Sequence, residues 1–269
     1  MNYESQSDLI LNYQEHSLWI TLDNPKMSNA YTEKMISYLV ETLQRADEDN
    51  NVRCIIITGA GKHFCAGGDV KGMQTQTGMF AGDSNELRER YKRGIQKIPL
   101  CFERLSTPVV AMINGAAIGA GLDLACMCDI RISNDKAKFG ETFTKLGLIP
   151  GDGGTYFLQR VVGFSKAMEL TLTGDVINSS TALDIGLINY EVGADSLLST
   201  TQDIVKKITK NAPIAVQMSK RSLISAYRSD LQTNLDMLCA FQGITQRTED
   251  HFSAVENIFN ESQTDFSHK

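Results

Sequence analysis

Apolar and polar side chains are arranged along the chain in patterns that predict its first elements. Residues 9–22 alternate between apolar and polar on both sides of Glu15 and His16, which predicts a β-hairpin that turns at these two residues. Residues 32–46 carry apolar side chains at helical spacing and predict a helix. The run 52–59, VRCIIITG, is β-branched and ends at glycine, which is typical of a strand buried on both faces.

The next segments are less regular. Residues 73–86 are polar and without periodicity, and they predict a mobile segment leading into a helix of roughly 86–105. Residues 107–133 predict a strand, a glycine-rich turn, a short helix and a second strand. After Pro150 the pattern is mainly helical, with one more strand near 187–192.

From about residue 195 onward only amphipathic helices are expected. No linker rich in Pro, Gly or Ser divides the chain. We therefore predict an α/β core over 1–195 that carries the functional site, followed by a helical C-terminal region, 196–269, whose use in oligomerisation is implied by the resemblance described below.

Composition narrows the class of protein. The 269 residues are 42% apolar and 22% charged, as in soluble globular proteins. A net charge of −6 without a cluster of Lys and Arg argues against a nucleic-acid partner. No apolar run is long enough to cross a membrane, and the N-terminus lacks the features of an export signal, so we expect a cytoplasmic protein with no membrane partner.

The sequence lacks the motifs of two common kinds of active site, a zinc site and a serine hydrolase. The six cysteines match no zinc spacing and are interpreted as buried, reduced thiols, so no metal site is predicted. No G-x-S-x-G occurs, which argues against a serine hydrolase of the usual construction.

Two glycine-rich turns, FCAGGDV (64–70) and NGAAIGAGLDL (114–124), each follow a predicted strand. The second fails the dinucleotide-binding fingerprint because Leu124 occupies the third glycine position. Backbone N–H groups at the start of a helix or turn lack intrahelical acceptors and can bind an anion. We predict that the N–H groups of Ala66 and Ala120 form an oxyanion hole; the alternative is that both turns are only tight connections.

Four ordered motifs strengthen the first interpretation: FCAGGDV, NGAAIGAGLDLACMCDI, FGETFTKLGLIPGDGGT and LTGDVINSSTALDIGLINYEV. Together they strongly resemble the enoyl-CoA hydratase/isomerase (crotonase) family, over nearly the whole chain. The resemblance implies a crotonase-like spiral of β-β-α units with an α-helical C-terminal extension, assembled as a homotrimer or a dimer of trimers. It also implies an acyl-CoA substrate, with coenzyme A as part of the substrate and no separate cofactor.

The resemblance assigns residues around this substrate. The oxyanion donors fall on Ala66 and Ala120, and the family's two acidic positions fall on Asp123 and Phe143. Coenzyme A is expected along two segments, whose residues are Pro25, Lys26 and Met27 in one and Gly67, Gly68, Asp69 and Val70 in the other. Lys26 has the alternative interpretation of a solvated loop lysine.

The candidate acids leave alternatives open. Asp123 lies among apolar residues, which should raise its pKa unless it pairs with a buried donor such as Arg131. Asp152 resembles an aspartate that some isomerases and dehalogenases of the family carry in this loop, or it caps the following helix. Glu141 is expected to miss the site, because helical spacing directs it away from Phe143.

From these assignments we expect an enzyme that forms a thioester enolate. The enzyme would hydrate an enoyl-CoA or move its double bond. Asp123 and Asp152 would be the proton-handling groups. The lack of an ionisable group at Phe143 favours migration, and the family's commonest activity favours hydration. The alternatives are a non-catalytic acyl-CoA-binding paralogue and a thioester hydrolase or dehalogenase.

Four side chains of the 73–95 segment are expected to pack their helix rather than line an acyl pocket: Met73, Met79, Phe80 and Tyr91.

Overall fold

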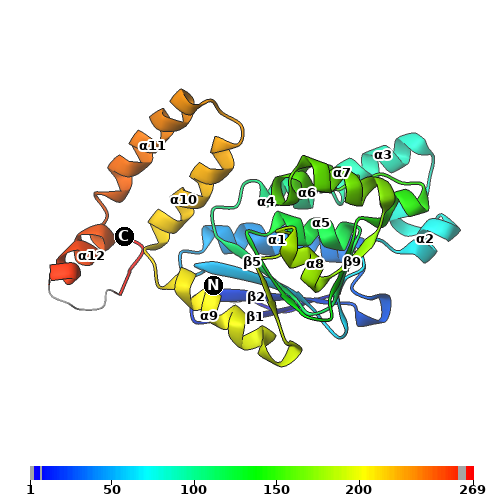
Figure 1. The fold of residues 1–269 in the computed structure, drawn as a ribbon, viewed down its shortest axis with the longest axis horizontal. Coiled ribbons are helices and arrows are strands. Elements are labelled where there is room, and N and C mark those ends of the chain that lie inside the picture. Colours follow the sequence, from blue (N-terminus) through cyan, green and yellow to red (C-terminus); the bar gives the residue numbers. More distant parts are fainter. Residues whose placement is uncertain (1–2, 7, 260–264) are drawn as a thin grey trace.

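The computed structural model describes residues 3–6, 8–259 and 265–269 (Figure 1). Its strands form two sheets. The larger has six strands in the order β1 (Asp8–Gln14), β2 (Ser17–Asp23), β3 (Cys54–Gly59), β5 (Val109–Ile113), β7 (Ile130–Asn134) and β10 (Tyr190–Val192). The smaller has four, in the order β4 (His63–Cys65), β6 (Ala116–Ile118), β8 (Lys138–Gly140) and β9 (Val176–Asn178).

The two sheets are built by one repeated step. Each of β3, β5 and β7 in the large sheet is followed along the chain by a short strand of the small sheet, namely β4, β6 and β8. A helix or helical turn then follows each short strand, and successive strands pair in parallel within their sheet. This arrangement confirms the expected spiral of β-β-α units.

The antiparallel hairpin β1–β2 starts the large sheet. Glu15 and His16 have φ values of 45° and 62°, and the register pairs Gln14 with Ser17, so the two residues form the turn that the pattern predicted. In β3 every residue is buried, as expected for a strand covered on both faces.

Helices cover both faces of the large sheet. The helices on one side include α1 (Glu33–Glu48), α4 (Lys97–Phe102) and α5 (Ala120–Met127), and α9 (Leu197–Thr209) lies on the other side (Figure 1). The remaining helices are α2 (Val70–Thr75), α3 (Ser84–Arg93), α6 (Gly154–Val162), α7 (Phe164–Thr173), α8 (Ser179–Asp184), α10 (Pro213–Ala226), α11 (Leu231–Thr245) and α12 (Glu249–Phe259). None of the described helices is long and apolar enough to span a membrane.

Two expectations from the sequence need correction. The single helix predicted at roughly 86–105 is two helices, α3 and α4, because the chain turns at Gly94 (φ −107°, ψ −108°). The segment 73–86, predicted to be mobile and without periodicity, contains the last residues of α2 and a 3₁₀ turn at Gly78–Phe80. The short strands β6, β8 and β9 were not predicted, since three residues are too few to show an alternating pattern.

The C-terminal helices begin on the core and then leave it. Helix α9 packs Ile204 and Val205 against Trp19 of β2, and the helices that stand apart from the core are α10, α11 and α12 (Figure 1). The division at residue 195 remains a prediction, although the packing of α9 places this helix with the sheet.

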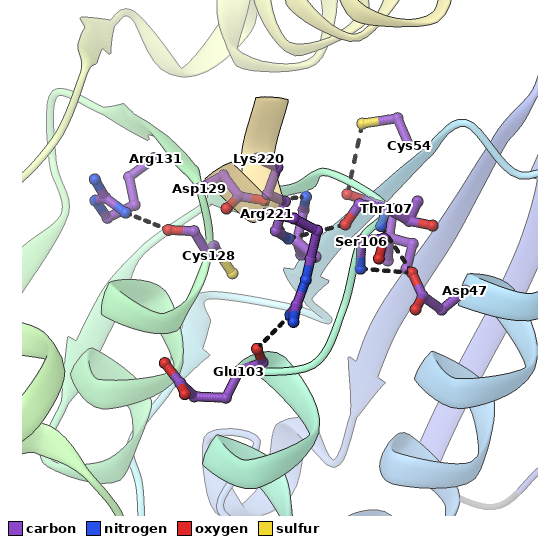
Figure 2. Close-up of polar contacts among 12 residues, drawn as sticks. Asp47, Cys54, Glu103, Ser106, Thr107, Cys128, Asp129, Arg131, Lys220 and Arg221 are labelled. Atoms are coloured by element: carbon purple, nitrogen blue, oxygen red, sulfur yellow. Dashed lines mark hydrogen bonds and ion pairs between the residues drawn. The ribbon is translucent and has the colours of Figure 1, made fainter. Parts of the chain in front are cut away.

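Helix α10 is fastened to the core by two basic side chains (Figure 2). Lys220 donates to the Thr107 carbonyl at 2.9 Å and to the Asp129 carboxylate at 2.7 Å, and Arg221 donates to the Glu103 carbonyl at 2.9 Å. Asp129 also accepts the Val109 N–H at 2.7 Å, so its role is structural.

We predict that Lys220→Met lowers the free energy of unfolding by about 1–3 kcal/mol, because Asp129 loses a charged donor while the apolar stem is retained. Urea unfolding measures this change. Lys207→Met, on an exposed position of α9, is the control and should change stability by less than about 0.5 kcal/mol. Equal stability of the two variants would show that Lys220 does not fasten α10.

Candidate active site

The two glycine-rich turns pack directly against each other. A Cβ atom placed on Gly121 would lie 2.0 Å from the Cys65 carbonyl oxygen, and one placed on Gly67 would lie 3.0 Å from the Ala120 nitrogen. Gly67 also has a φ of +85°, which favours glycine. The missing side chains therefore allow the backbones of the two turns to touch.

The hydrogen bonds of the first turn correct one predicted role. The Ala66 N–H donates to the Ser28 carbonyl at 2.9 Å, and the Gly67 N–H donates to the Cys65 sulfur at 3.4 Å. Ala66 is therefore not an available oxyanion donor. The N–H of Gly68, two residues later, has no hydrogen-bond partner among the described residues, and the same is true of Ala120 at the first position of α5.

Gly68 and Ala120 both line one cavity of about 260 Å³. Phe143 and Asp152 also line it, and its remaining walls come from Tyr31, from α1 and from the segment 73–95. The expectation that this segment only packs on itself was wrong, because all four of its singled-out side chains line the cavity: Met73, Met79, Phe80 and Tyr91.

Three buried carboxyl groups belong to this region: Asp152 lines the cavity, and Asp123 and Glu141 do not. Asp123 and Glu141 are fully buried, and Asp152 is 3% exposed. A Cβ atom placed on Gly154, at the start of α6, would lie 2.2 Å from Asp123 Oδ1 and 2.5 Å from Glu141 Oε1. Asp123 and Glu141 thus share the space that Gly154 leaves open.

The expectation that Glu141 misses the site was therefore wrong. It assumed helical spacing between Glu141 and Phe143, but Glu141 precedes the 3₁₀ helix η3 (Thr142–Leu146) with φ −91° and ψ 66°. This non-helical backbone turns Glu141 inward towards Asp123, while Phe143 contributes to the cavity wall.

The surroundings of these acids favour their neutral forms. Burial, followed by the charges of Asp152 and Glu141, raises the pKa of Asp123 well above its ordinary value. Burial likewise raises the pKa of Glu141 to about 8 and that of Asp152 above its usual range, although a hydrogen bond from Asp123 opposes the rise in both. Three such groups titrate as a coupled set and share protons.

The alternative structural roles of these acids are not observed. Arg131 donates to the Leu187 and Cys128 carbonyls rather than to Asp123 (Figure 2 shows the second contact). Helix α6 begins after Gly153 without a side-chain cap, so Asp152 does not serve as its N-cap.

The two segments predicted to hold coenzyme A lie side by side. The Ala66–Ser28 hydrogen bond and a second bond from the Tyr31 N–H to the Gly67 carbonyl, at 2.9 Å, tie the loop that follows η1 (Pro25–Met27) to the first turn. Pro25, Lys26 and Met27 are exposed, as is Val70, and Asp69 caps α2 by accepting the Lys71 N–H at 3.0 Å. Their role in binding remains a prediction.

No cluster of His, Cys, Asp and Glu in the described part of the chain could hold a metal ion. The site thus consists of two unpaired backbone donors, an apolar cavity and a carboxyl group at its wall. Sequence reasoning named Gly68 only as a contact to coenzyme A and set Glu141 aside. The free N–H of Gly68 and the inward position of Glu141 carry no sequence signal of their own, because each depends on local backbone geometry.

Comparison with known proteins places the chain in a family. A family model described as Enoyl-CoA hydratase/isomerase matches residues 13–268. The chain is 34% identical to the short-chain-enoyl-CoA hydratase of Clostridium acetobutylicum over 93% of both chains, and 31% identical to the 1,2-epoxyphenylacetyl-CoA isomerase of Escherichia coli over 97% of this chain and 99% of that one. A crystal structure of enoyl-CoA hydratase from Bacillus anthracis superposes with a TM-score of 0.91 at 30% identity, covering 98% of this chain and all of the other.

The fold and the paired turns define an enzyme of the crotonase type. The chain belongs to the enoyl-CoA hydratase/isomerase family.

We predict that Gly154→Ala destabilises the protein by about 1–3 kcal/mol and lowers its activity, because the new methyl group would collide with Asp123 and Glu141. Gly243→Ala is the control, since a Cβ atom placed on Gly243 in α11 would meet nothing within 4 Å beyond the backbone of its own helix. It should leave stability unchanged or raise it by about 0.5–1 kcal/mol. Urea unfolding measures the stability of both variants. If Gly154→Ala unfolded at the same urea concentration as wild type and kept full activity, the described packing would be contradicted.

Proposed function

We propose that the protein converts an enoyl-CoA through a thioester enolate and moves its carbon–carbon double bond. The N–H groups of Gly68 and Ala120 hold the thioester oxygen and stabilise the negative charge that develops there. This replaces the pair that the sequence suggested, Ala66 and Ala120. The open hydrogen-bonding capacity of both groups at one cavity supports the assignment.

Asp152 is the proton-handling group in this proposal. Its carboxylate takes a proton from the carbon next to the thioester and returns it two carbons further along the acyl chain, so no proton is gained or lost overall. The observation that carries the proposal is that Asp152, 3% exposed, lines the cavity together with both unpaired N–H donors. Asp123 adjoins it and supports its protonation state.

Hydration is the second candidate. It is supported by relatives named hydratases, including the crotonyl-CoA hydratase of Syntrophomonas wolfei, 33% identical over the full length of both chains. A water held between two acids would be the nucleophile in that reaction. The apolar Phe143 at the cavity wall favours migration instead, because it leaves fewer polar groups to hold that water.

Three further assignments belong to this proposal. Coenzyme A lies along Pro25–Met27 and Gly67–Val70. The chain assembles as a homotrimer or a dimer of trimers and acts in the cytoplasm, in fatty-acid metabolism. The proposed assembly is supported by apolar side chains that α10, α11, α12 and their connections leave exposed: Leu223, Tyr227, Leu231, Leu235, Ile244, Phe252, Ile258 and Phe259.

Asp152→Asn should lower kcat for 3-enoyl-CoA thioesters by about 10²–10⁴-fold, because an amide cannot carry the proton. Steady-state assays with 3-enoyl and 2-enoyl thioesters of several chain lengths measure this. Asp203→Asn, on the exposed face of α9, is the matched control and should keep wild-type rates. Wild-type turnover of 2-enoyl thioesters alone would favour hydration, and full activity of Asp152→Asn would remove Asp152 from the reaction.

Ala120→Pro tests the backbone donor. Proline lacks the N–H but is tolerated at the first position of a helix, where Ala120 lies. We expect kcat/KM to fall by about 10²–10³-fold. Ala120→Gly, which keeps the N–H, should retain most of the activity, and equal rates of two folded variants would contradict the role of this donor.

A further inference from the structure

Tyr31 lines the cavity with a polar side chain that the reaction described above does not use. It is 3% exposed, and its hydroxyl has no hydrogen-bond partner among the described residues. A buried hydroxyl without a partner costs free energy unless a group that enters the cavity accepts a hydrogen bond from it. The hydroxyl is therefore available to a ligand in this cavity.

The backbone on both sides of this side chain is fixed. The Tyr31 N–H donates to the Gly67 carbonyl at 2.9 Å, and the next residue, Thr32, caps α1 by accepting the Met35 N–H at 3.0 Å. The Gly67 carbonyl and the Gly68 N–H belong to one trans peptide unit, in which they point in opposite directions. The contact that holds Tyr31 thus also orients the N–H of Gly68.

The thioester oxygen needs no further donor. A carbonyl oxygen has two lone pairs, and the N–H groups of Gly68 and Ala120 use both of them in the proposed reaction. The acyl chain is the other part of the substrate that this cavity would hold. An oxygen atom on that chain is therefore the acceptor that the Tyr31 hydroxyl could meet.

The other walls of the cavity combine apolar side chains with a second hydroxyl. Tyr91 of α3 lies against Gly151, where an added Cβ atom would be 3.0 Å from Tyr91 Cε1, and its hydroxyl also has no hydrogen-bond partner among the described residues. Apolar walls suit a carbon chain, and a few unpaired polar groups give such a pocket its specificity. The apolar side chains on these walls are Ile36, Met73, Met79, Phe80, Ile95 and Phe143.

The charged side chains that line the cavity besides Asp152 differ from Tyr31 because they are exposed: Glu33, Arg90 and Arg93. Bulk water satisfies such groups before a substrate binds. Arg90 also donates to the Gly78 carbonyl at 2.6 Å, and Arg93 forms an ion pair with Glu89. The Tyr31 hydroxyl has no such protein acceptor.

We propose that Tyr31 is a specificity-determining residue whose hydroxyl donates a hydrogen bond to an oxygen atom on the acyl chain of the substrate. The favoured substrates are then acyl-CoA thioesters whose carbon chain carries a hydroxyl, oxo or carboxylate group. This inference rests on the proposed binding of an acyl-CoA at this cavity. Burial raises the pKa of Tyr31 well above its ordinary value, so the hydroxyl keeps its proton and remains a donor.

Calorimetric binding of saturated acyl-CoA thioesters measures this preference without turnover. Each pair has one chain length and ends either in a methyl group or in a hydroxyl or carboxylate group, and a series of lengths moves the oxygen along the cavity. At the best-fitting length, Tyr31→Phe should lower the preference for the hydroxyl-bearing member, the ratio of the two Kd values, by about 3- to 10-fold. The loss should be larger for a carboxylate, which accepts a stronger hydrogen bond. Tyr190→Phe, at an exposed position of β10, is the control and should keep the wild-type preference.

An unchanged preference in Tyr31→Phe at every chain length would overturn the inference. In particular, equal losses for both members of each pair would mean that Tyr31 acts on the thioester or on Asp152, which all substrates share. Thioesters that bind and react without this oxygen dependence would leave the proposed function standing and remove this inference alone. If the wild-type protein bound no acyl-CoA, the proposed function and the inference would both fail.

Urea unfolding without substrate provides an independent readout. Tyr38 of α1, 6% exposed, is a matched buried tyrosine whose hydroxyl donates to the Glu4 carbonyl. Tyr38→Phe should lower the urea midpoint because it loses this hydrogen bond, whereas Tyr31→Phe should leave the midpoint unchanged or raise it, because it removes an unpaired hydroxyl. A loss in Tyr31→Phe as large as that in Tyr38→Phe would show that the Tyr31 hydroxyl has a structural partner, and this would overturn the inference.

Discussion

The site depends on the contact between two backbone turns. Gly67 and Gly121 each occupy a position where a side chain would collide with the opposite turn, so glycine at both positions brings the loop after β4 against the start of α5. The contact leaves the N–H groups of Gly68 and Ala120 without partners at one cavity. Unpaired backbone donors cost free energy in the folded protein, and a thioester oxygen that accepts from both would offset this cost most fully when it carries negative charge.

The buried acids are the second component of the site. Gly154 leaves the space in which Asp123 and Glu141 lie together, and Asp152, whose charge acts on Asp123, lines the cavity. Burial raises the pKa of both Asp123 and Glu141, and the charges of neighbouring acids add to the rise, because buried carboxylates are poorly solvated and repel each other. In the proposed reaction, the backbone donors Gly68 and Ala120 and the acid Asp152 act at one cavity, which all three residues line.

Much of this arrangement could be predicted from the sequence. The hairpin and β3 followed from periodicity, the importance of both glycine-rich turns from their motifs, and the spiral from the family resemblance. The finer assignments failed where local backbone geometry decides. The Ala66 N–H is not free to act as an oxyanion donor because the loop after η1 places the Ser28 carbonyl against it, a contact between distant segments that no local pattern predicts. Glu141 was set aside because helical spacing was assumed where the backbone is not helical.

The central claim is that the N–H groups of Gly68 and Ala120 act together on one oxygen atom. Infrared spectroscopy of a bound enoyl-CoA labelled with ¹³C at the thioester carbonyl measures this interaction directly, since hydrogen bonds to the oxygen weaken the carbon–oxygen bond. The account predicts that the labelled band lies at lower frequency in the complex than for the same thioester in water. A band at or above the frequency in water would contradict it.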